Sequence, residues 1–579
     1  MPEYEYTAFS FAPVQGFIEK SRKLRDLYGA SLILSYLSHQ LVKKAEDLKL
    51  DVISPGLLNV QKGMPNRILV RGKFERQDVE KTLLCEWQKV LETCRIWVED
   101  NLGIPKEQYC WAQSEEEKGK HKGEWERWGS HTWEVFWGYG ESIPAAMKDL
   151  ERRKLKRDWT GINWSGESSS LSGTDAIAWH KLGKFNREPG LPLNETEKQE
   201  LKRFYRQLAW VLDEPNTRNH KARKQRGEFI PSDKKLEEHF KPKNEDNSGK
   251  KKKSGGKFIA PNERLSIPEL VKRLVTLPYL AKQIDMEELD EGFKDVVRDP
   301  GYWTGWFMGD GDEVGKKLID LASGTHPEND LKIFTHEMRY WGQHFENKNS
   351  CLGGKERVIY AGGDDFFGVL YSEEEEHKKN PEPLKPIDVI KWLFKLEGRW
   401  NNLQKTLEEE LCLNFTFSVG FVWAAHNVPQ RDILQHCREA EKRAKKLGRN
   451  RVTIRVVFNS GQFVQWTCPW DYLHVLKNYR DRDDKSWEEN PNWTHLYTDW
   501  AHLKARHAIQ LNKIENIKYT KEPALTLFNL YFNNAGKTFT QERLWCKLAG
   551  DNTDVAIVNW INDLIQVGWQ LCQTNSSNI

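Results

Sequence analysis

The sequence lacks the cysteine patterns of a zinc-binding or disulfide-stapled protein. Its 579 residues include 9 cysteines, and none of them forms a C-x-x-C pair of the kind found in zinc ribbons. The odd number and scattered positions of these cysteines also argue against a disulfide framework. We therefore expect no structural zinc, and a reducing cytoplasmic setting.

Long apolar runs and an excess of one charge are also missing. No stretch approaches the roughly 18 apolar residues that span a bilayer, and the first residues (MPEY) do not begin a signal peptide. Lys+Arg 88 against Asp+Glu 85 gives a net charge of +3, which excludes a histone-like binder but permits a local basic groove. The 25 Trp, 25 Phe and 17 Tyr are plentiful; they serve either as core and interface residues or as base-stacking platforms.

Two stretches of the chain show the same order of predicted elements. Apolar alternation and helical spacing predict strands at 4–11, 51–54, 67–71 and 133–137, with helices over 13–44 and 77–98. Further on they predict strands at 302–308, 357–360, 366–371 and 415–421, with helices over 314–322 and 387–411, then a helix over 430–447 and a strand over 451–458. This β-α-β-β-α-β order is that of a ferredoxin-like fold, so we predict an α+β protein with two such palm domains plus helical domains.

The chain is too long for one hydrophobic core, and its composition changes suggest six segments. We expect a first palm-like domain at 1–145, a helical segment at 146–212, a polar basic linker or loop at 213–258, a helical connector at 259–300, the second palm at 301–470 and a helical C-terminal domain at 471–579. Four consecutive lysines at 250–253 either form part of a solvated loop or contact a nucleic-acid backbone.

Acidic residues of the second palm point to metal chemistry. Asp310 ends the first predicted strand, whereas Asp364 and Asp365 lie in the following hairpin after Gly362 and Gly363. In a ferredoxin-like sheet these elements are central neighbours, so the carboxylates can converge on hard cations such as Mg²⁺. The two glycines permit positive φ and leave space for a nucleotide. G-G-D-D alone fits an ordinary hairpin equally well, but together with Asp310 it predicts two-metal nucleotidyl transfer.

A basic segment ends the predicted helix over 430–447. Lys445 precedes Gly448, so it fits the cations that complement a helix C-terminus, with Gly448 ending the helix. The same lysine could reach a triphosphate held at the acidic residues, and both interpretations stay open.

The motifs around these residues resemble those of known nucleotide cyclases. The sequences at 362–366 (GGDDF), 417–420 (FSVG) and 444–451 (AKKLGRNR) are similar to the palm of GGDEF-type cyclases. The G-G-D-D form, with D-G-D-x-x-G at 310–315, looks more like the large polymerase/cyclase-like subunit of type III CRISPR effector complexes. Residues 9–28 (FSFAPVQGFIEKSRKLRDLY) are similar to the start of that family's first palm.

The resemblance implies a subunit of a crRNA-guided ribonucleoprotein, in which target RNA switches on conversion of ATP into cyclic oligoadenylates. By the family's motif, Asp310 and Asp364 would bind Mg²⁺ or Mn²⁺ with Asp365 beside them. The nucleotide would meet Gly311, Asp312, Gly362, Gly363 and Lys445. The first palm lacks an acidic pair and would supply only a wall for a second ATP.

Two departures from the family pattern shape the expectations. The first motif already resembles the first palm, and none of the 16 histidines precedes an Asp, so we expect neither the HD nuclease domain of many members nor single-stranded DNase activity. The cysteine-rich zinc module of many members is missing as well. Two alternatives remain open: a catalytically silent palm scaffold in the same kind of complex, and a stand-alone nucleotide cyclase or polymerase.

Overall fold

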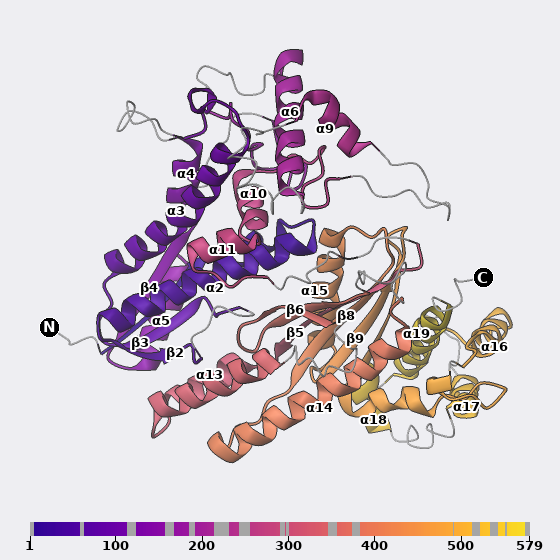
Figure 1. Cartoon of the computed structure of the whole chain (residues 1–579). Coiled ribbons are helices and arrows are strands. Elements are labelled where there is room, and N and C mark those ends of the chain that lie inside the picture. The colour runs from indigo at the N-terminus through magenta and orange to yellow at the C-terminus, as the bar shows by residue number, and fades with distance from the viewer. Residues whose placement is uncertain are drawn as a thin grey trace. The chain divides into compact units, whose positions relative to one another are not determined.

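The chain divides into two compact units. The computed structural model describes residues 5–57, 63–112, 123–156, 167–183, 192–213, 231–241, 255–289, 296, 300–344, 356–372, 383–489, 491–511, 521–532, 542–550 and 553–573. The first unit comprises Met1–Val52 and Asn66–Glu291, and the second comprises Ile53–Pro65 and Gly292–Ile579. In Figure 1 the colour runs along both units from indigo to yellow. None of the described helices combines the length and the apolarity needed to cross a membrane.

A four-stranded sheet with the predicted topology forms the base of the first unit. The strands are β1 (Tyr6–Ala12), β2 (Asp51–Ser54), β3 (Arg67–Arg71) and β4 (Glu134–Gly140). They lie in the order β2-β3-β1-β4, with β1 antiparallel to both β3 and β4. The helices between them are α1 (Gln15–Glu19), α2 (Leu24–Asp47), α3 (Arg76–Asn101) and α4 (Glu124–His131), and α5 (Ile143–Lys154) follows β4. The β-α-β-β-α-β order predicted for this region is confirmed.

The single helix predicted over 13–44 is wrong, because the chain breaks it into α1 and α2. The Asp26 carboxylate accepts hydrogen bonds from the backbone N–H groups of Arg22 and Lys23, each at 2.9 Å. These bonds satisfy N–H groups at the start of α2, so a new helix begins there instead of continuing from α1.

The described residues after α5 depart from the prediction in two places: 167–183 are not helical, whereas a helix, α9 (Asp233–Phe240), forms inside the predicted linker at 213–258. The rest of the first unit contains η1 (Lys106–Gln108), α6 (Glu195–Leu212), α9, α10 (Ile267–Leu274) and α11 (Pro278–Ile284). Residues 167–183 contain no helix and instead form isolated bridges between Ser168 and Ala176 and between Ile177 and Ser266. The lysine run at 250–253 lies outside the described residues.

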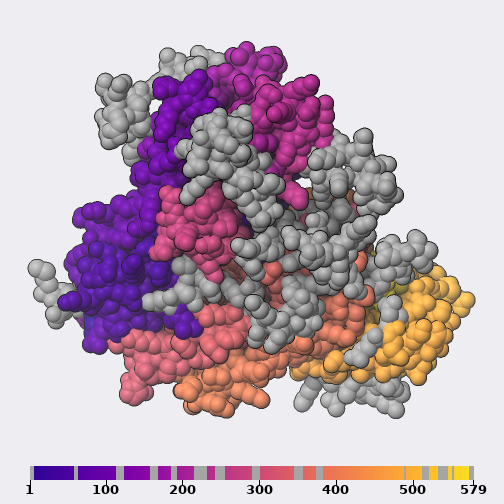
Figure 2. Space-filling model, in the orientation of Figure 1, coloured from indigo at the N-terminus to yellow at the C-terminus, as the bar shows by residue number. Residues whose placement is uncertain are grey.

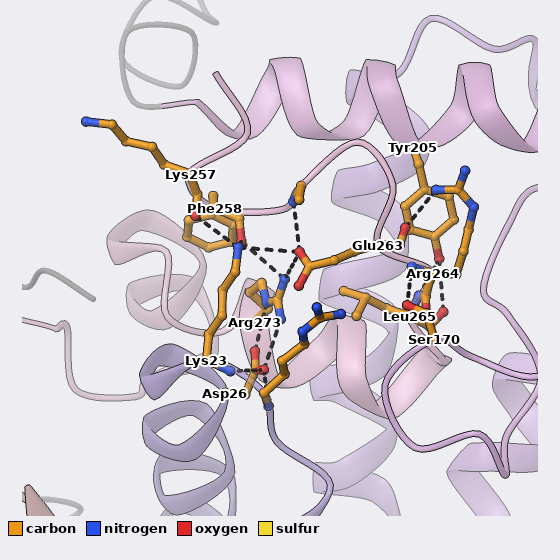
Figure 3. A network of polar contacts seen from close by, with 12 residues as sticks. Lys23, Asp26, Ser170, Tyr205, Lys257, Phe258, Glu263, Arg264, Leu265 and Arg273 are labelled. Carbon is orange, nitrogen blue, oxygen red and sulfur yellow. Dashed lines mark hydrogen bonds and ion pairs between the residues drawn. The ribbon is translucent and has the colours of Figure 1, made fainter. Parts of the chain in front are cut away.

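A buried ionic network joins α10 to the start of α2 (Figure 3). The Arg273 guanidinium, which is 0% exposed, donates to Asp26 at 2.7 and 2.9 Å and to Glu263 at 2.8 Å. Lys23 Nζ lies 3.4 Å from Glu263 and donates to the carbonyl of Phe258 at 3.1 Å. Two cations thus neutralise two buried carboxylates, which is the condition under which buried charge is tolerated.

A six-stranded sheet organises the second unit. Its strands are β5 (Thr304–Gly311), β6 (Glu356–Ala361), β7 (Phe366–Leu370), β8 (Phe417–Ala424), β9 (Arg451–Val457) and β10 (Phe463–Pro469), in the order β10-β9-β8-β5-β7-β6. The helices are α12 (Val314–Ala322), α13 (Pro327–Gln343), α14 (Pro386–Leu411) and α15 (Gln430–Lys446). Strand β5 is antiparallel to β7 and β8, and β9 is parallel to β8. The ferredoxin-like order is confirmed, and β10 is an addition that the sequence patterns did not predict.

Aromatic side chains fill the interior of the described parts. The Phe417 ring stacks on Trp400 at 4.5 Å and on Trp470 at 4.6 Å between ring centroids. The largest fully buried side chains are mostly tryptophans: Trp87, Trp111, Trp306, Trp392, Trp400, Trp423, Trp466, Trp493 and Trp500. For these residues the core interpretation of the aromatic content applies, because a ring without exposed surface cannot stack on a base.

Helices cover the far end of the six-stranded sheet, as the sequence predicted. They are η4 (Trp470–Asn478), η5 (Trp487–Glu489), α16 (Thr494–Ala505), α17 (Glu522–Tyr531), α18 (Glu542–Ala549) and α19 (Asp554–Gln573). In Figure 2 the yellow atoms of the C-terminal part lie beside the orange atoms of the second unit. Trp560 Nε1 donates to the carbonyl of Thr467 at 2.8 Å, which ties α19 to β10. A Cβ at Gly550 would lie 2.8 Å from Leu447, directly after α15.

Candidate active site

Three carboxylates converge at the end of β5. Asp310 is the last residue but one of this central strand, and Asp364 and Asp365 lie in the turn between β6 and β7. One oxygen from each side chain lies within 4.8 Å of the others. They meet because β5 and β7 are neighbours, with Gly309 opposite Phe366. The structure thus brings together the three acids that the sequence singled out.

The hairpin glycines are needed for space, not for unusual dihedral angles. Neither Gly362 nor Gly363 has φ in the left-handed region, so the turn does not use the positive φ that glycine permits. A Cβ at Gly362 would lie 2.2 Å from the hydroxyl oxygen of Tyr360, whereas a Cβ at Gly363 would meet nothing within 4 Å. Gly362 lets the turn fold over Tyr360, and Gly363 leaves open space beside the acids.

Gly311 allows the hairpin to approach β5. A Cβ there would lie 3.0 Å from Cβ of Asp364 and 2.5 Å from Val314, so a larger residue would displace the acidic hairpin. The Gly311 N–H also donates to the carbonyl of Asp364 at 3.2 Å. This backbone contact fixes the turn against the strand that carries Asp310.

Lys445 points into the acidic group from α15. Its Nζ contacts the carboxylate of Asp310 and lies 2.5 Å from Oε1 of Glu441, one helical turn earlier. Lys446 is exposed. The helix comes this close because β8 has Gly420, where a Cβ would lie 2.3 Å from the carbonyl of Cys437. Sequence reasoning missed Glu441, although its i, i+4 spacing to Lys445 is the signal that finds such pairs.

The electrostatics favour a cation among the acids. Desolvation and then the neighbouring Asp310 and Asp364 carboxylates raise the pKa of Asp365 well above its usual range, and Lys445 only partly opposes this. Asp365 is exposed to solvent, so repulsion from the two neighbouring carboxylates is the main physical cause of its raised pKa. Burial raises the pKa of Glu441 as well. Burial alone would lower the pKa of Lys445, but its contacts with Asp310 and Glu441 raise it. Carboxylates that crowd in this way fit a divalent cation, which would relieve their repulsion.

Asp312 lies beside this group but uses its carboxylate differently. It is 4% exposed, and it accepts hydrogen bonds from the hydroxyls of Ser418 and Thr416 at 2.8 and 2.7 Å and from the N–H of Asn450 at 2.9 Å. The nucleotide-binding roles assigned to Asp312, Gly311, Gly362, Gly363 and Lys445 stay predictions.

Arg339 contacts the base of the hairpin, and no sequence pattern pointed to this residue. It is 1% exposed and donates to the carbonyl of Gly63 and, at 3.3 Å, to that of Ala361, the last residue of β6. Burial lowers the pKa of Arg339 to about 10. A charged group at this depth holds the hairpin base in one conformation.

Two family models match the chain. The first, Cas10/Cmr2 second palm domain, matches residues 303–453, and the second, CRISPR-associated protein Cmr2 N-terminal, matches residues 6–91. The first range contains Asp310, Asp364 and Asp365 as well as Lys445. A search of curated proteins gave no significant match.

Solved structures share the fold at low sequence identity. A type III-B Cmr-beta structure in the apo state matches with a TM-score of 0.50 and 10% identity over 92% of this chain and 77% of that chain. A Csm1-Csm4 cassette in complex with one ATP matches with a TM-score of 0.43 and 13% identity, over 98% and 70%. Csm1 of T. onnurineus matches with a TM-score of 0.42 and 13% identity, also over 98% and 70%. At these identities the first likeness concerns the fold alone, and the other two carry no argument.

Proposed function

The chain is a Cas10-like protein, and from this premise we propose that its second palm is a metal-dependent nucleotidyltransferase that converts ATP into cyclic oligoadenylates. It acts as a subunit of a crRNA-guided type III CRISPR ribonucleoprotein in the cytoplasm, switched on by target RNA. The product and the RNA-guided setting follow from the family resemblance of the motifs at 310–315, 362–366 and 444–451.

The observation that carries the proposal is the convergence of Asp310, Asp364 and Asp365 within 4.8 Å. These side chains would hold Mg²⁺ or Mn²⁺, since carboxylate oxygens are the ligands that such cations prefer. A bound cation supplies neutralisation of the triphosphate and activation of the attacking hydroxyl. A purely structural role explains this arrangement poorly, because three carboxylates gathered at one point repel one another.

Lys445 stabilises the leaving group, and the glycines provide space for the nucleotide. The ammonium group of Lys445 contacts Asp310, one of the acids that would hold the metal-bound triphosphate. It meets the negative charge that develops on the departing pyrophosphate, where a preorganised cation is most effective. The open space at Gly363 gives the nucleotide room beside Asp364.

The test uses the full chain assembled with its partner subunits and crRNA. ATP with Mg²⁺ or Mn²⁺ is added with and without target RNA, and the products are identified by mass spectrometry. We expect cyclic oligoadenylates only with target RNA and none after chelation of the metal. The absence of any nucleotide product under all conditions would favour a silent scaffold, and equal product without RNA would favour a stand-alone cyclase.

A further inference from the structure

Asp312 joins three separate pieces of the second unit. Its Oδ1 accepts from Ser418 on β8, and its Oδ2 accepts from Thr416 just before β8 and from the N–H of Asn450 just before β9. Its own N–H donates to the carbonyl of Thr416 at 2.7 Å. The carboxylate is 4% exposed, so these hydrogen bonds decide its position.

The loop held by Asp312 has an unfavourable backbone. Gly448, Arg449 and Asn450 follow one another with φ of 123°, 60° and 50°. Glycine tolerates this region and asparagine visits it more readily than most residues, but arginine enters it only when the surroundings hold it there. The Asn450 N–H bonded to Asp312 is such a hold, and Arg449 N–H donates to the carbonyl of Ala444 at 3.2 Å.

This loop begins directly after the turn of α15 that carries Lys445. Asp312 itself lies just after β5, two residues beyond Asp310. The next residue, Glu313, also has a left-handed φ of 59°. Asp310 and Lys445 form an ion pair, and the hydrogen bonds of Asp312 fix the backbone close to each of them: the end of β5 beside Asp310 and the loop at 448–450 beside Lys445.

We propose that Asp312 is a positioning residue: its buried carboxylate sets where Lys445 stands relative to the acidic group, without itself contacting nucleotide or metal. The inference rests on the proposed function for its activity readout. It replaces direct nucleotide contact by Asp312 with an action through Lys445. Three donors already occupy its two oxygens, and the oxygens that converge in the acidic group come from Asp310, Asp364 and Asp365.

Comparing Asp312→Asn with Asp312→Ala in the assembled complex distinguishes positioning of Lys445 from direct contact with nucleotide or metal. An asparagine oxygen still accepts from Thr416 and Asn450, and its amide can donate to the Ser418 hydroxyl, which turns to accept. We expect Asp312→Asn to keep the rate within about threefold and Asp312→Ala to lower kcat by on the order of a hundredfold, as for a misplaced group. If Asn is as damaging as Ala and raises the Mg²⁺ concentration required, the negative charge is what matters and the proposal fails.

A double-mutant cycle tests whether the effect passes through Lys445. In a Lys445→Ala background, Asp312→Ala should cause little further loss, because the group that it positions is already gone. Fully additive losses would overturn the inference. Asp320→Ala, which removes an exposed carboxylate from α12, is the matched control and should leave the rate unchanged.

Hydrogen exchange gives a readout that needs no catalysis. Asp312→Ala should speed amide exchange in residues 447–452 of the full chain, Asp312→Asn should not, and Mn²⁺ binding should be equal in both. Unchanged exchange in Asp312→Ala would overturn the inference even if the wild-type complex is active. Faster exchange would support it even if the complex makes no product, which would refute the proposed function alone. Should Asp312→Ala not fold, Thr416→Val replaces it by removing one donor to the same oxygen, with the same expected outcomes.

Discussion

Each unit of this chain gathers acidic side chains, and the described contacts place different cations beside the two groups. In the first unit Asp26 and Glu263 share Arg273, and Lys23 lies 3.4 Å from Glu263. In the second unit Asp310, Asp364 and Asp365 meet within 4.8 Å. There the described contacts bring in Lys445, which is shared with a fourth acid, Glu441.

The pKa directions express the same contrast. Burial alone would raise the pKa of Asp26 and of Glu263, yet Arg273 holds both below their usual range. In the second unit the pKa of Asp365 and that of Glu441 are both raised. A neutralised acidic group stabilises a fold, whereas one with an excess of carboxylates is ready to bind a cation.

The topology of the two sheets is shared, so it does not explain the difference. In both sheets the first strand, β1 or β5, lies between the second strand of the hairpin and the fourth strand of the β-α-β-β-α-β order, and β9 and β10 extend only the second sheet. β1 (YTAFSFA) carries no acid, whereas β5 (TGWFMGDG) carries Asp310 near its end. A few side chains at strand ends thus decide which palm can hold a metal.

The largest expected effect comes from removing the excess acids. Asp364→Ala with Asp365→Ala should lower nucleotide-product formation more than about a thousandfold, since the cation loses its ligands. The unfolding temperature should not fall, because the two carboxylates repel each other in the absence of metal. Product formation by the assembled complex and calorimetry of the full chain check both outcomes, and full activity in the double variant would refute the site.

Arg273→Ala removes the neutralising cation from the other group. It should destabilise the chain by about 3–5 kcal/mol, because Asp26 and Glu263 remain buried without their partner. Mn²⁺ binding should be unchanged. Arg203→Ala is the matched control: its ion pair with Asp233 is exposed on both sides, and its loss should cost at most about 1 kcal/mol. Denaturant unfolding measures both, and equal costs would abolish the contrast.

Lys445→Ala tests the cation at the second group. Catalysis should fall by on the order of ten- to a thousandfold, as for the loss of a preorganised electrostatic contact. Lys446→Ala on the neighbouring exposed position should cost only a few tenths to about 1 kcal/mol of stability and leave the rate nearly intact. Steady-state kinetics of the two variants distinguish contact with the triphosphate from a role at the helix C-terminus. Equally small losses of rate in both variants would favour the helix C-terminal role.

The smallest expected effect is an acid sensitivity of the neutralised group. Because the folded pKa values of Asp26 and Glu263 lie below their ordinary values of 3.8 and 4.5, both add stability above those values and lose it as pH falls through the folded ones. The unfolding temperature of the wild type should therefore drop below about pH 4.5, and less steeply in Arg273→Ala. Parallel pH profiles for the two proteins would contradict the assignment.

Much of the fold was predictable because the apolar patterns are local. Alternation and helical spacing gave both sheets, but the break between α1 and α2 depends on Asp26 reaching back to Arg22 and Lys23. The strand β10 (FVQWTCP) mixes polar with apolar residues without clear alternation, so its pairing with β9 decides its conformation.

The acids of the site were predictable for a similar reason, but the residues that hydrogen-bond to Asp312 and those that contact the acidic hairpin and Lys445 were not. Asp310, Asp364 and Asp365 stand in short motifs at the ends of neighbouring strands. The partners of Asp312 lie 104, 106 and 138 residues away along the chain, and only the strand register brings them together. Arg339 and Glu441 act through helices packed on the sheet, which no single-strand pattern reveals.

The contact between α18 and the loop beyond Lys445 has a mechanical consequence. Gly550 leaves no room for a side chain next to Leu447, and Arg451 donates to the carbonyl of Leu548 at 3.5 Å. The end of α18 thus touches the left-handed loop both before and after its strained residues. A partner that pushed or rotated the C-terminal helices would displace this loop, and with it the lysine at the acids, without touching the site itself.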